Sequence, residues 1–338
     1  TPAISFSSKV TGNPDTAILF VADDGKLTKT GKDLDKALGG LLSHQCDTHP
    51  KFKGEAGQTL VVALPPKADY LRVILLGLGK EGGKEAKTTA EELETAGGKL
   101  AGALAAQGAV KAVVLNADDV APASVASVLF GLRLGSYSFD TYKTVKKNKD
   151  DPVLKSVAVI SASAKTLAKD SGSYDDLAQA IALTRDLVNA PPNKLYPQSF
   201  ADQIKSTLVP LGVKVQVFDD KALTKMGMGC LLAVGQASEH LPRLVIMSWP
   251  GSGKTTGKST GKSTEKSKKQ KPLAFVGKGI TFDAGGLNVK PYEGMMDMKM
   301  DMGGAATVVG LMSMLAKRNC KVPVVAAVAL AENAISDE

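Results

Sequence analysis

The chain has 338 residues, 43% of them hydrophobic and 22% charged, which is enough for roughly two globular domains. Its formal net charge is +8, but residues 251–271 hold seven lysines against one glutamate, so that segment carries +6 and leaves +2 for the rest. The positive charge therefore belongs to one segment, which makes nucleic acid an unlikely partner for the fold as a whole.

The cysteines and the apolar runs indicate the compartment. Cys46, Cys230 and Cys320 are odd in number and widely spaced, which argues against a disulfide framework. The first ten residues lack the basic and apolar regions of a secretory signal. The longest apolar run, 322–331, is half of the roughly 20 residues that span a bilayer. We expect a soluble cytoplasmic protein without a membrane partner.

Strand and helix signals alternate through the first half of the chain. Such alternation is typical of an α/β domain, which we expect over residues 1–170. The predicted strands are Thr16–Ala22, Thr59–Leu64, Arg72–Leu76, Ala109–Leu115 and Val153–Ser161, and the predicted helices are Thr89–Ala106 and Ala121–Gly135.

A helix from Tyr174 to Val188 follows, with apolar residues on one face. Ser173 and Asp176 have the spacing of a capping box at its start, and Pro191-Pro192 ends it. We expect residues 171–192 to connect the two domains.

The second domain, residues 193–338, is also predicted to be α/β. Together these patterns predict an N-terminal α/β domain joined by a helix to a C-terminal α/β domain. The predicted helices are Pro197–Leu208 and Ala305–Leu315, and the predicted strands are Val213–Phe218, Leu231–Val234, Arg243–Trp249, Leu273–Val276 and Val322–Leu330.

Between Pro250 and Lys271 the sequence contains almost only glycine, serine, threonine and lysine. Such a composition cannot bury enough apolar surface to offset the cost of ordering, so we expect a disordered surface insertion. Two of its Gly-Lys pairs, at Gly253 and Gly257, resemble a phosphate-binding loop. That motif needs a glycine five residues earlier, where Ser248 and Ser252 stand.

Two other motifs are weaker alternatives. Gly77-Leu-Gly-Lys-Glu-Gly82 fits a dinucleotide-binding pattern, but the next helix begins only near Thr89. His44, Cys46 and His49 are too few for a closed zinc site. With His240 the only other histidine, no two histidines have the spacing of the His-Glu-x-x-His motif. A metal site in this chain must therefore use carboxylates and lysine.

Those residue types gather between Phe275 and Ala306, where Lys278, Asp283, Lys290 and Asp301 lie among glycines. Gly277 and Gly279 predict a sharp turn at Lys278, at the end of a short strand. Two carboxylates suit a divalent cation. A lysine can bind a metal only when it is neutral, whereas a charged lysine stabilises an oxyanion.

The segments Val276-Gly-Lys-Gly-Ile-Thr-Phe-Asp-Ala-Gly-Gly286 and Met298-Lys-Met-Asp-Met-Gly-Gly-Ala-Ala306, with Lys290 between them, resemble the leucyl (cytosol) aminopeptidase family. The resemblance implies a smaller N-terminal α/β domain and a C-terminal α/β/α catalytic domain with a mixed central sheet, which is incomplete here. It implies that Lys278, Asp283 and Asp301 bind two divalent ions, zinc or manganese, with Asp283 bridging them. Lys290 matches the catalytic lysine.

The resemblance also implies that Met298, Asp283 and Lys290 contact a peptide substrate, that the first residue released is leucine or another apolar one, and that the protein is a homohexamer. The family completes its site with an Asn-Thr-Asp-Ala-Glu-Gly-Arg segment, whose arginine holds a bicarbonate. That segment does not occur before Glu338. We therefore expect an incomplete aminopeptidase. The alternative is an inactive relative that acts as a binding or scaffold protein.

Overall fold

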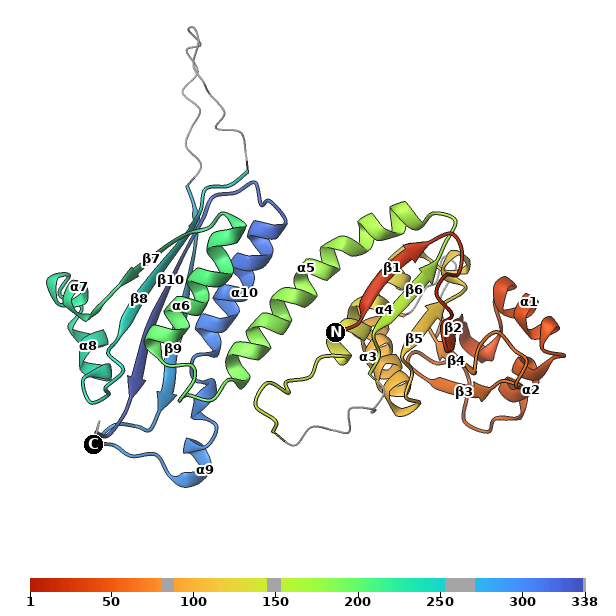
Figure 1. Ribbon diagram of the computed structural model, residues 1–338, viewed down its shortest axis with the longest axis horizontal. Coiled ribbons are helices and arrows are strands. Elements are labelled where there is room, and N and C mark those ends of the chain that lie inside the picture. Colours follow the sequence, from red (N-terminus) through yellow and green to blue (C-terminus); the bar gives the residue numbers. More distant parts are fainter. Residues whose placement is uncertain (81–87, 145–152, 253–270, 337–338) are drawn as a thin grey trace, which may run out of the picture. The chain divides into compact units, whose positions relative to one another are not determined.

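The computed structural model describes residues 1–80, 88–144, 153–252 and 271–336 (Figure 1). The chain divides into two units, Thr1–Ala178 and Gln179–Glu338. Residues 253–270, most of the lysine-rich insertion predicted at 250–271, and part of the Gly77–Gly82 motif lie outside the described residues. Within the described ranges, each unit contains one sheet. The first unit has two clusters of buried apolar residues and the second has one.

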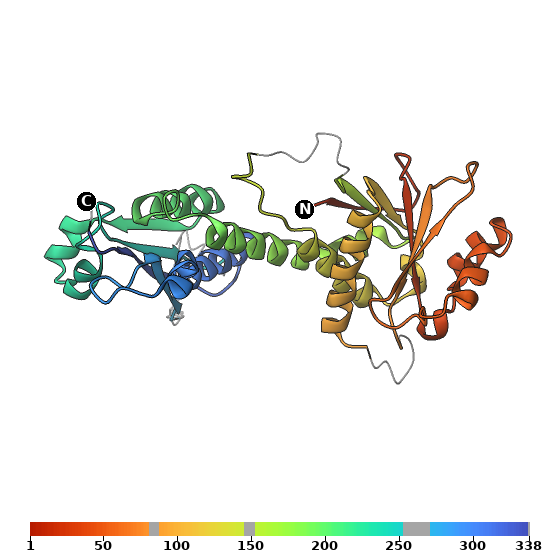
Figure 2. The same cartoon turned by 90° about the horizontal axis from the view of Figure 1, so that it is seen from below.

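The first unit is a six-stranded sheet with the order β1-β6-β5-β2-β4-β3, parallel except for β3. Figure 2 shows α1 and α2 on one face and α3 and α4 on the other. The strands are β1 (Ala3–Ser7), β2 (Thr16–Val21), β3 (Thr59–Ala63), β4 (Arg72–Gly77), β5 (Lys111–Val114) and β6 (Ser156–Ile160), and the helices are α1 (Lys29–Ala37), α2 (Leu41–Thr48), α3 (Ala90–Ala106) and α4 (Pro122–Gly135).

Strand β2 shows why both faces need helices. All six of its residues are buried. Ile18 and Phe20 belong to the core under α3 and α4, whereas Ala17, Leu19 and Val21 belong to the core under α1 and α2. Successive side chains of a strand point to opposite faces, so a continuous apolar run is typical of a central strand covered on both sides.

The second unit contains a mixed four-stranded sheet with the order β7-β8-β10-β9, which confirms the expected fold class. β10 is antiparallel to β8 and parallel to β9. Helices α6 and α10 pack on one face of this sheet (Figure 1). The elements are α6 (Pro197–Leu208), β7 (Lys214–Phe218), α7 (Asp220–Lys225), α8 (Gly229–Gly235), β8 (Arg243–Trp249), β9 (Leu273–Asp283), α9 (Tyr292–Met295), α10 (Gly303–Lys317) and β10 (Val324–Asn333).

Helix α5 (Ala164–Asn189) is longer than predicted, and the capping box at Ser173 is wrong, because Ser173 lies inside the helix. Leu167 explains the extra turns, since it is 4% exposed and packs into the core of the first unit. This burial outweighs the weak helix propensity of the Ser-Gly-Ser segment at 171–173.

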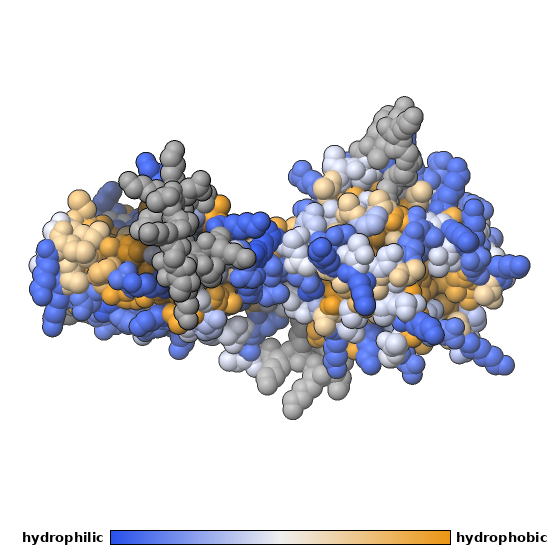
Figure 3. All heavy atoms as spheres, turned by 90° about the horizontal axis from the view of Figure 1, so that it is seen from above, coloured by the Kyte–Doolittle hydropathy of each residue, from blue (hydrophilic) through white to orange (hydrophobic). Residues whose placement is uncertain are grey.

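The predicted strand Leu231–Val234 is also wrong, because these residues lie in helix α8. A run of four apolar residues fits a strand or a buried helical turn equally well. No pattern in the sequence predicted β1, α1, α2, α7 or α9, which are short elements. Among the described residues, no helix has the length and apolarity needed to cross a membrane. On the face shown in Figure 3, hydrophilic and hydrophobic side chains are mixed over both units.

We expect Gly97→Ala to destabilise the first unit by about 1–3 kcal/mol, the usual cost of overpacking a core. A Cβ on Gly97 of α3 would lie 2.0 Å from the Val128 carbonyl oxygen of α4, so the helices would have to separate. Gly102, on the same helix, has open space around its position. Gly102→Ala should instead stabilise the first unit by up to about 1 kcal/mol, because alanine has a higher helix propensity than glycine. Urea unfolding of both variants tests the contrast, and equal effects would contradict it.

Candidate functional site

The charged residues predicted from the sequence lie at the end of β9 and just before α10. Lys278 is inside β9, and Asp283 is its last residue. Lys290 follows in the connection to α9, and Asp301 comes directly after the 3₁₀ helix Met298–Met300. This 3₁₀ helix contacts β9, and Met298 is half-buried.

The predicted turn at Lys278 is wrong, since β9 continues for five residues beyond it. The flanking glycines have another function. A Cβ on Gly277 would lie 2.6 Å from the Gly304 carbonyl oxygen, and a Cβ on Gly279 would lie 2.6 Å from the Ala329 carbonyl oxygen. The glycines therefore let the first turn of α10 and strand β10 approach the backbone of β9 closely.

This approach brings Asp301 next to Lys278. The Lys278 Nζ lies 2.8 Å from the Asp301 Oδ1, and the two side chains are 60% and 19% exposed. The Oδ2 of Asp301 is buried and has no hydrogen-bond partner. A buried carboxylate oxygen without a partner is costly. A cation beside Oδ2 would remove that cost, so Asp301 fits a metal ligand.

Asp283 forms a second lysine–aspartate pair. Its Oδ2 lies 3.2 Å from the Lys290 Nζ. Its Oδ1 accepts hydrogen bonds from the Gly285 N–H at 3.0 Å and from the Asn333 Nδ2 at 2.7 Å. Burial opposes ionisation, but these hydrogen bonds and the Lys290 charge together lower the pKa of Asp283 below its ordinary value.

The loop after Asp283 places Lys290. The Lys290 N–H donates to the Ala284 carbonyl at 2.9 Å. Gly285 has φ +92°, and a Cβ there would lie 2.2 Å from the Asn288 carbonyl oxygen. Only glycine fits this tight, left-handed position. The Asp-Ala-Gly-Gly sequence therefore folds the chain back so that Lys290 reaches the carboxylate seven residues earlier.

The donor set fits a divalent cation but does not complete a coordination sphere. Two carboxylates and a lysine nitrogen are available, each carboxylate now paired with an ammonium group. Over the described ranges, no three histidine, cysteine, aspartate or glutamate side chains lie together so that they could hold a metal ion. A complete site therefore needs further ligands.

Asn333 was not among the residues predicted for the site. It is the last residue of β10 and lies opposite Asp283 in the sheet register. The sequence signal for β10 was only an apolar run, which does not reveal which residue of the neighbouring strand each position faces. Asn333 could have been found only after the register was known.

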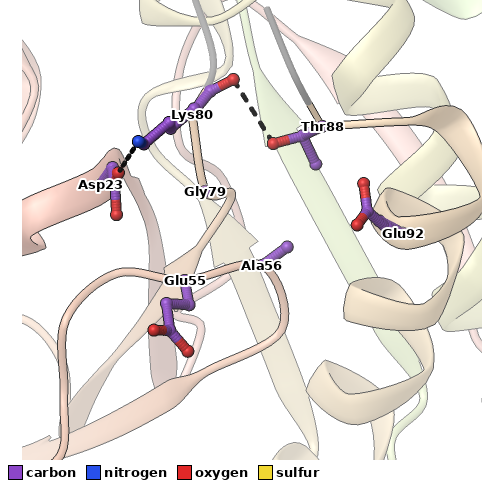
Figure 4. Close-up of a pocket in the computed structure, with 7 residues that line it drawn as sticks. All are labelled: Asp23, Glu55, Ala56, Gly79, Lys80, Thr88 and Glu92. Carbon is purple, nitrogen blue, oxygen red and sulfur yellow. Dashed lines mark hydrogen bonds and ion pairs between the residues drawn. The ribbon is translucent and has the colours of Figure 1, made fainter.

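A separate cavity of about 380 Å³ lies in the first unit, at the carboxyl ends of β2 and β4 (Figure 4). Among the described residues, its lining includes the carboxylates of Asp23, Glu55 and Glu92 and one basic residue, Lys80. Three carboxylates would repel a pyrophosphate. The cavity therefore does not support the dinucleotide-binding alternative that the glycines from Gly77 onward suggest.

We expect Asp283→Asn to lower the stability of the metal-free protein at neutral pH. The folded-state pKa of Asp283 lies below its ordinary value of 3.8, so its stabilising effect is complete above that value and is lost as the pH falls through the folded-state pKa. The stability difference between wild type and variant should therefore shrink in acid. Urea unfolding with chelator, from about pH 2.5 to pH 7, measures it. The exposed Asp297→Asn serves as the control, and a pH-independent difference for Asp283→Asn would contradict the assignment.

Two family models match the chain. The model described as "Cytosol aminopeptidase family, N-terminal domain" matches residues 18–146, and the one described as "Cytosol aminopeptidase family, catalytic domain" matches residues 182–338. A protein named "Probable cytosol aminopeptidase" from Gluconobacter oxydans is 41% identical over 93% of this chain and 59% of its own length. One of the same name from Rhodopseudomonas palustris is 40% identical over 94% of this chain and 60% of its own length.

Solved structures agree with the fold. A variant of tomato leucine aminopeptidase has a TM-score of 0.77 and 25% identity, over 99% of this chain and 64% of that one. The bottromycin maturation enzyme BotP in complex with Mn has a TM-score of 0.71 and 24% identity, over 95% of this chain and 60% of that one. The chain thus spans about three fifths of the length of the curated relatives that it matches. With both family domains matched along most of its length, the chain belongs to the cytosol aminopeptidase family.

Proposed function

We propose that the full-length protein is a metal-dependent aminopeptidase that releases N-terminal residues from peptides. The observation that carries the proposal is the buried, unpartnered Oδ2 of Asp301 beside Lys278. Such an oxygen has a physical reason to exist where a cation binds. Membership of the cytosol aminopeptidase family supports the same activity.

Lys278, Asp283 and Asp301 would hold two divalent ions, zinc or manganese, and Asp283 would contact both. When bound, such ions supply Lewis acidity at the peptide carbonyl and make water a stronger nucleophile. Asp283 suits this role because its lowered pKa keeps it ionised and able to accept at both oxygens. Lys278 would have to give up a proton and its ion pair with Asp301.

Lys290 would act on the substrate directly. Its side chain is 33% exposed, and Asp283 and the Ala284 carbonyl fix its position. A charged ammonium at this place can donate to the carbonyl oxygen of the peptide and stabilise the negative charge that develops there. Its exposure lets a substrate reach it from solvent.

Met298 would line the pocket for the first side chain of the peptide. A flexible, polarizable thioether suits apolar side chains of different shapes. We therefore propose a preference for leucine and similar residues. The further ligands, the arginine with its bicarbonate, the homohexameric assembly and the cytoplasmic location are proposals that rest on the family alone.

Removal of metal is the first test of the activity. The full-length protein, dialysed against a chelator, should lose hydrolysis of a leucyl chromogenic substrate and regain it with manganese, cobalt or zinc, because only the ions supply the Lewis acid. Circular dichroism before and after dialysis controls for unfolding. A folded full-length protein that is inactive with every metal would overturn the proposal and favour a binding or scaffold role.

Replacement of Lys290 tests its role. Lys290→Met keeps most of the side-chain length but removes the charge, so kcat should fall about 10²–10³-fold, the usual effect of losing one oxyanion donor. Manganese affinity, measured by calorimetry, should stay within a few-fold of wild type. Lys321→Met, at an exposed lysine, is the matched control. An unchanged kcat in Lys290→Met would exclude Lys290 from the reaction.

A further inference from the structure

Asn333 and the Gly285 N–H donate hydrogen bonds to the same carboxylate oxygen of Asp283, Oδ1. The Asn333 Nδ2 donates to the Asp283 Oδ1 at 2.7 Å, and the Asn333 backbone carbonyl accepts from the Ala284 N–H at 2.9 Å. Asn333 therefore contacts the end of β9 through both its side chain and its backbone. Lys290 approaches the other oxygen, Oδ2, so the two oxygens of Asp283 have separate partners.

An irregularity of the sheet creates this contact. β10 pairs with β9 in regular register up to Ala331 opposite Ile280, after which Glu332 lies opposite Phe282. Thr281 is the extra residue of β9, and its buried hydroxyl donates to the Ala331 carbonyl at 3.3 Å. A shift of one residue reverses which face each later side chain points to. Without the bulge, Asn333 would lie opposite Phe282 rather than Asp283.

The opposite side of the Asn333 amide is equally restricted. A Cβ on Gly286 would lie 2.8 Å from the Asn333 Oδ1, and Gly286 has φ +62°. The amide thus lies between the carboxylate of Asp283 and the backbone of Gly286. This arrangement fixes the amide with its NH₂ group toward Asp283, because an ionised carboxylate can only accept.

An uncharged donor is the suitable partner for a carboxylate that binds cations. It fixes the oxygen and favours the ionised form without adding a positive charge that would repel a metal ion. Partners behind the ligands of a metal site orient those ligands, and their loss typically weakens metal affinity about 10–100-fold.

We propose that Asn333 is a positioning residue of the metal site, which orients the Asp283 carboxylate toward the bound cations. This inference rests on the proposed function, in which Asp283 is a metal ligand. It extends that function to a residue that contacts neither substrate nor metal and acts through Asp283 alone.

The test uses Asn333→Leu, which keeps the branched shape and removes the donor. Calorimetry of the chelator-treated full-length protein should give a manganese Kd about 10–100-fold above that of wild type. At saturating manganese, KM for the leucyl substrate should stay within about twofold, since uniform substrate binding is not affected. A folded Asn333→Leu with wild-type manganese Kd would overturn the inference.

Two controls separate the outcomes. Ser238→Ala removes the 2.5 Å hydrogen bond to Glu332, the residue before Asn333, and tests whether loosening the end of β10 is enough to weaken metal binding. Its Kd should match wild type, and a rise equal to that of Asn333→Leu would overturn the specific role. If Asn333→Leu does not fold, Asn333→Ser, whose hydroxyl is too short to reach Asp283, gives the same measurement.

Asp283→Asn distinguishes this inference from the proposed function. Wild-type manganese affinity in Asp283→Asn would remove Asp283 from the metal site and overturn both proposals. Lost affinity in Asp283→Asn together with wild-type affinity in Asn333→Leu would overturn only the role of Asn333.

Discussion

The close backbone contact between β9 and the first turn of α10 is the constraint on which the rest of the site depends. Gly277 of β9 faces the Gly304 carbonyl at a distance that leaves no room for a Cβ. Because Asp301 lies two residues before α10, the same contact sets how far its carboxylate is from Lys278. A side chain at Gly277 or Gly304 would push α10 away from β9. The same movement would take the Asp301 carboxylate away from Lys278.

The bulge at Thr281 is the second constraint, and it acts on Asp283 rather than Asp301. It changes the register between β9 and β10, so that Asn333 faces Asp283. The site thus has one carboxylate fixed by helix packing and one fixed by sheet register. Two independent constraints of this kind hold ligands more rigidly than a loop could, which is the usual requirement for a preorganised site.

The sequence predicted Lys278, Asp283, Lys290 and Asp301 as site residues because their types and spacing carry chemistry that a packing role does not explain, and the structure brings them together as two lysine–aspartate pairs. The sequence misjudged their setting, since the glycine beside Lys278 predicts a turn and a close backbone approach equally well. Only the second is present. The sequence could not predict the contact of Asn333 with Asp283 or the early start of α5. Both depend on residues distant in the sequence, which local patterns do not encode.

The charges of the site are balanced without any metal. Each carboxylate is neutralised by a lysine, one pair at 2.8 Å and the other at 3.2 Å, so neither aspartate is buried as a bare charge. On the proposed roles, cations take over this neutralisation when they bind. Lys278 would then exchange its proton for a metal, whereas Lys290 would keep its charge and turn from Asp283 toward the substrate. With these roles, the same two lysines would stabilise the empty site and take part in the loaded one.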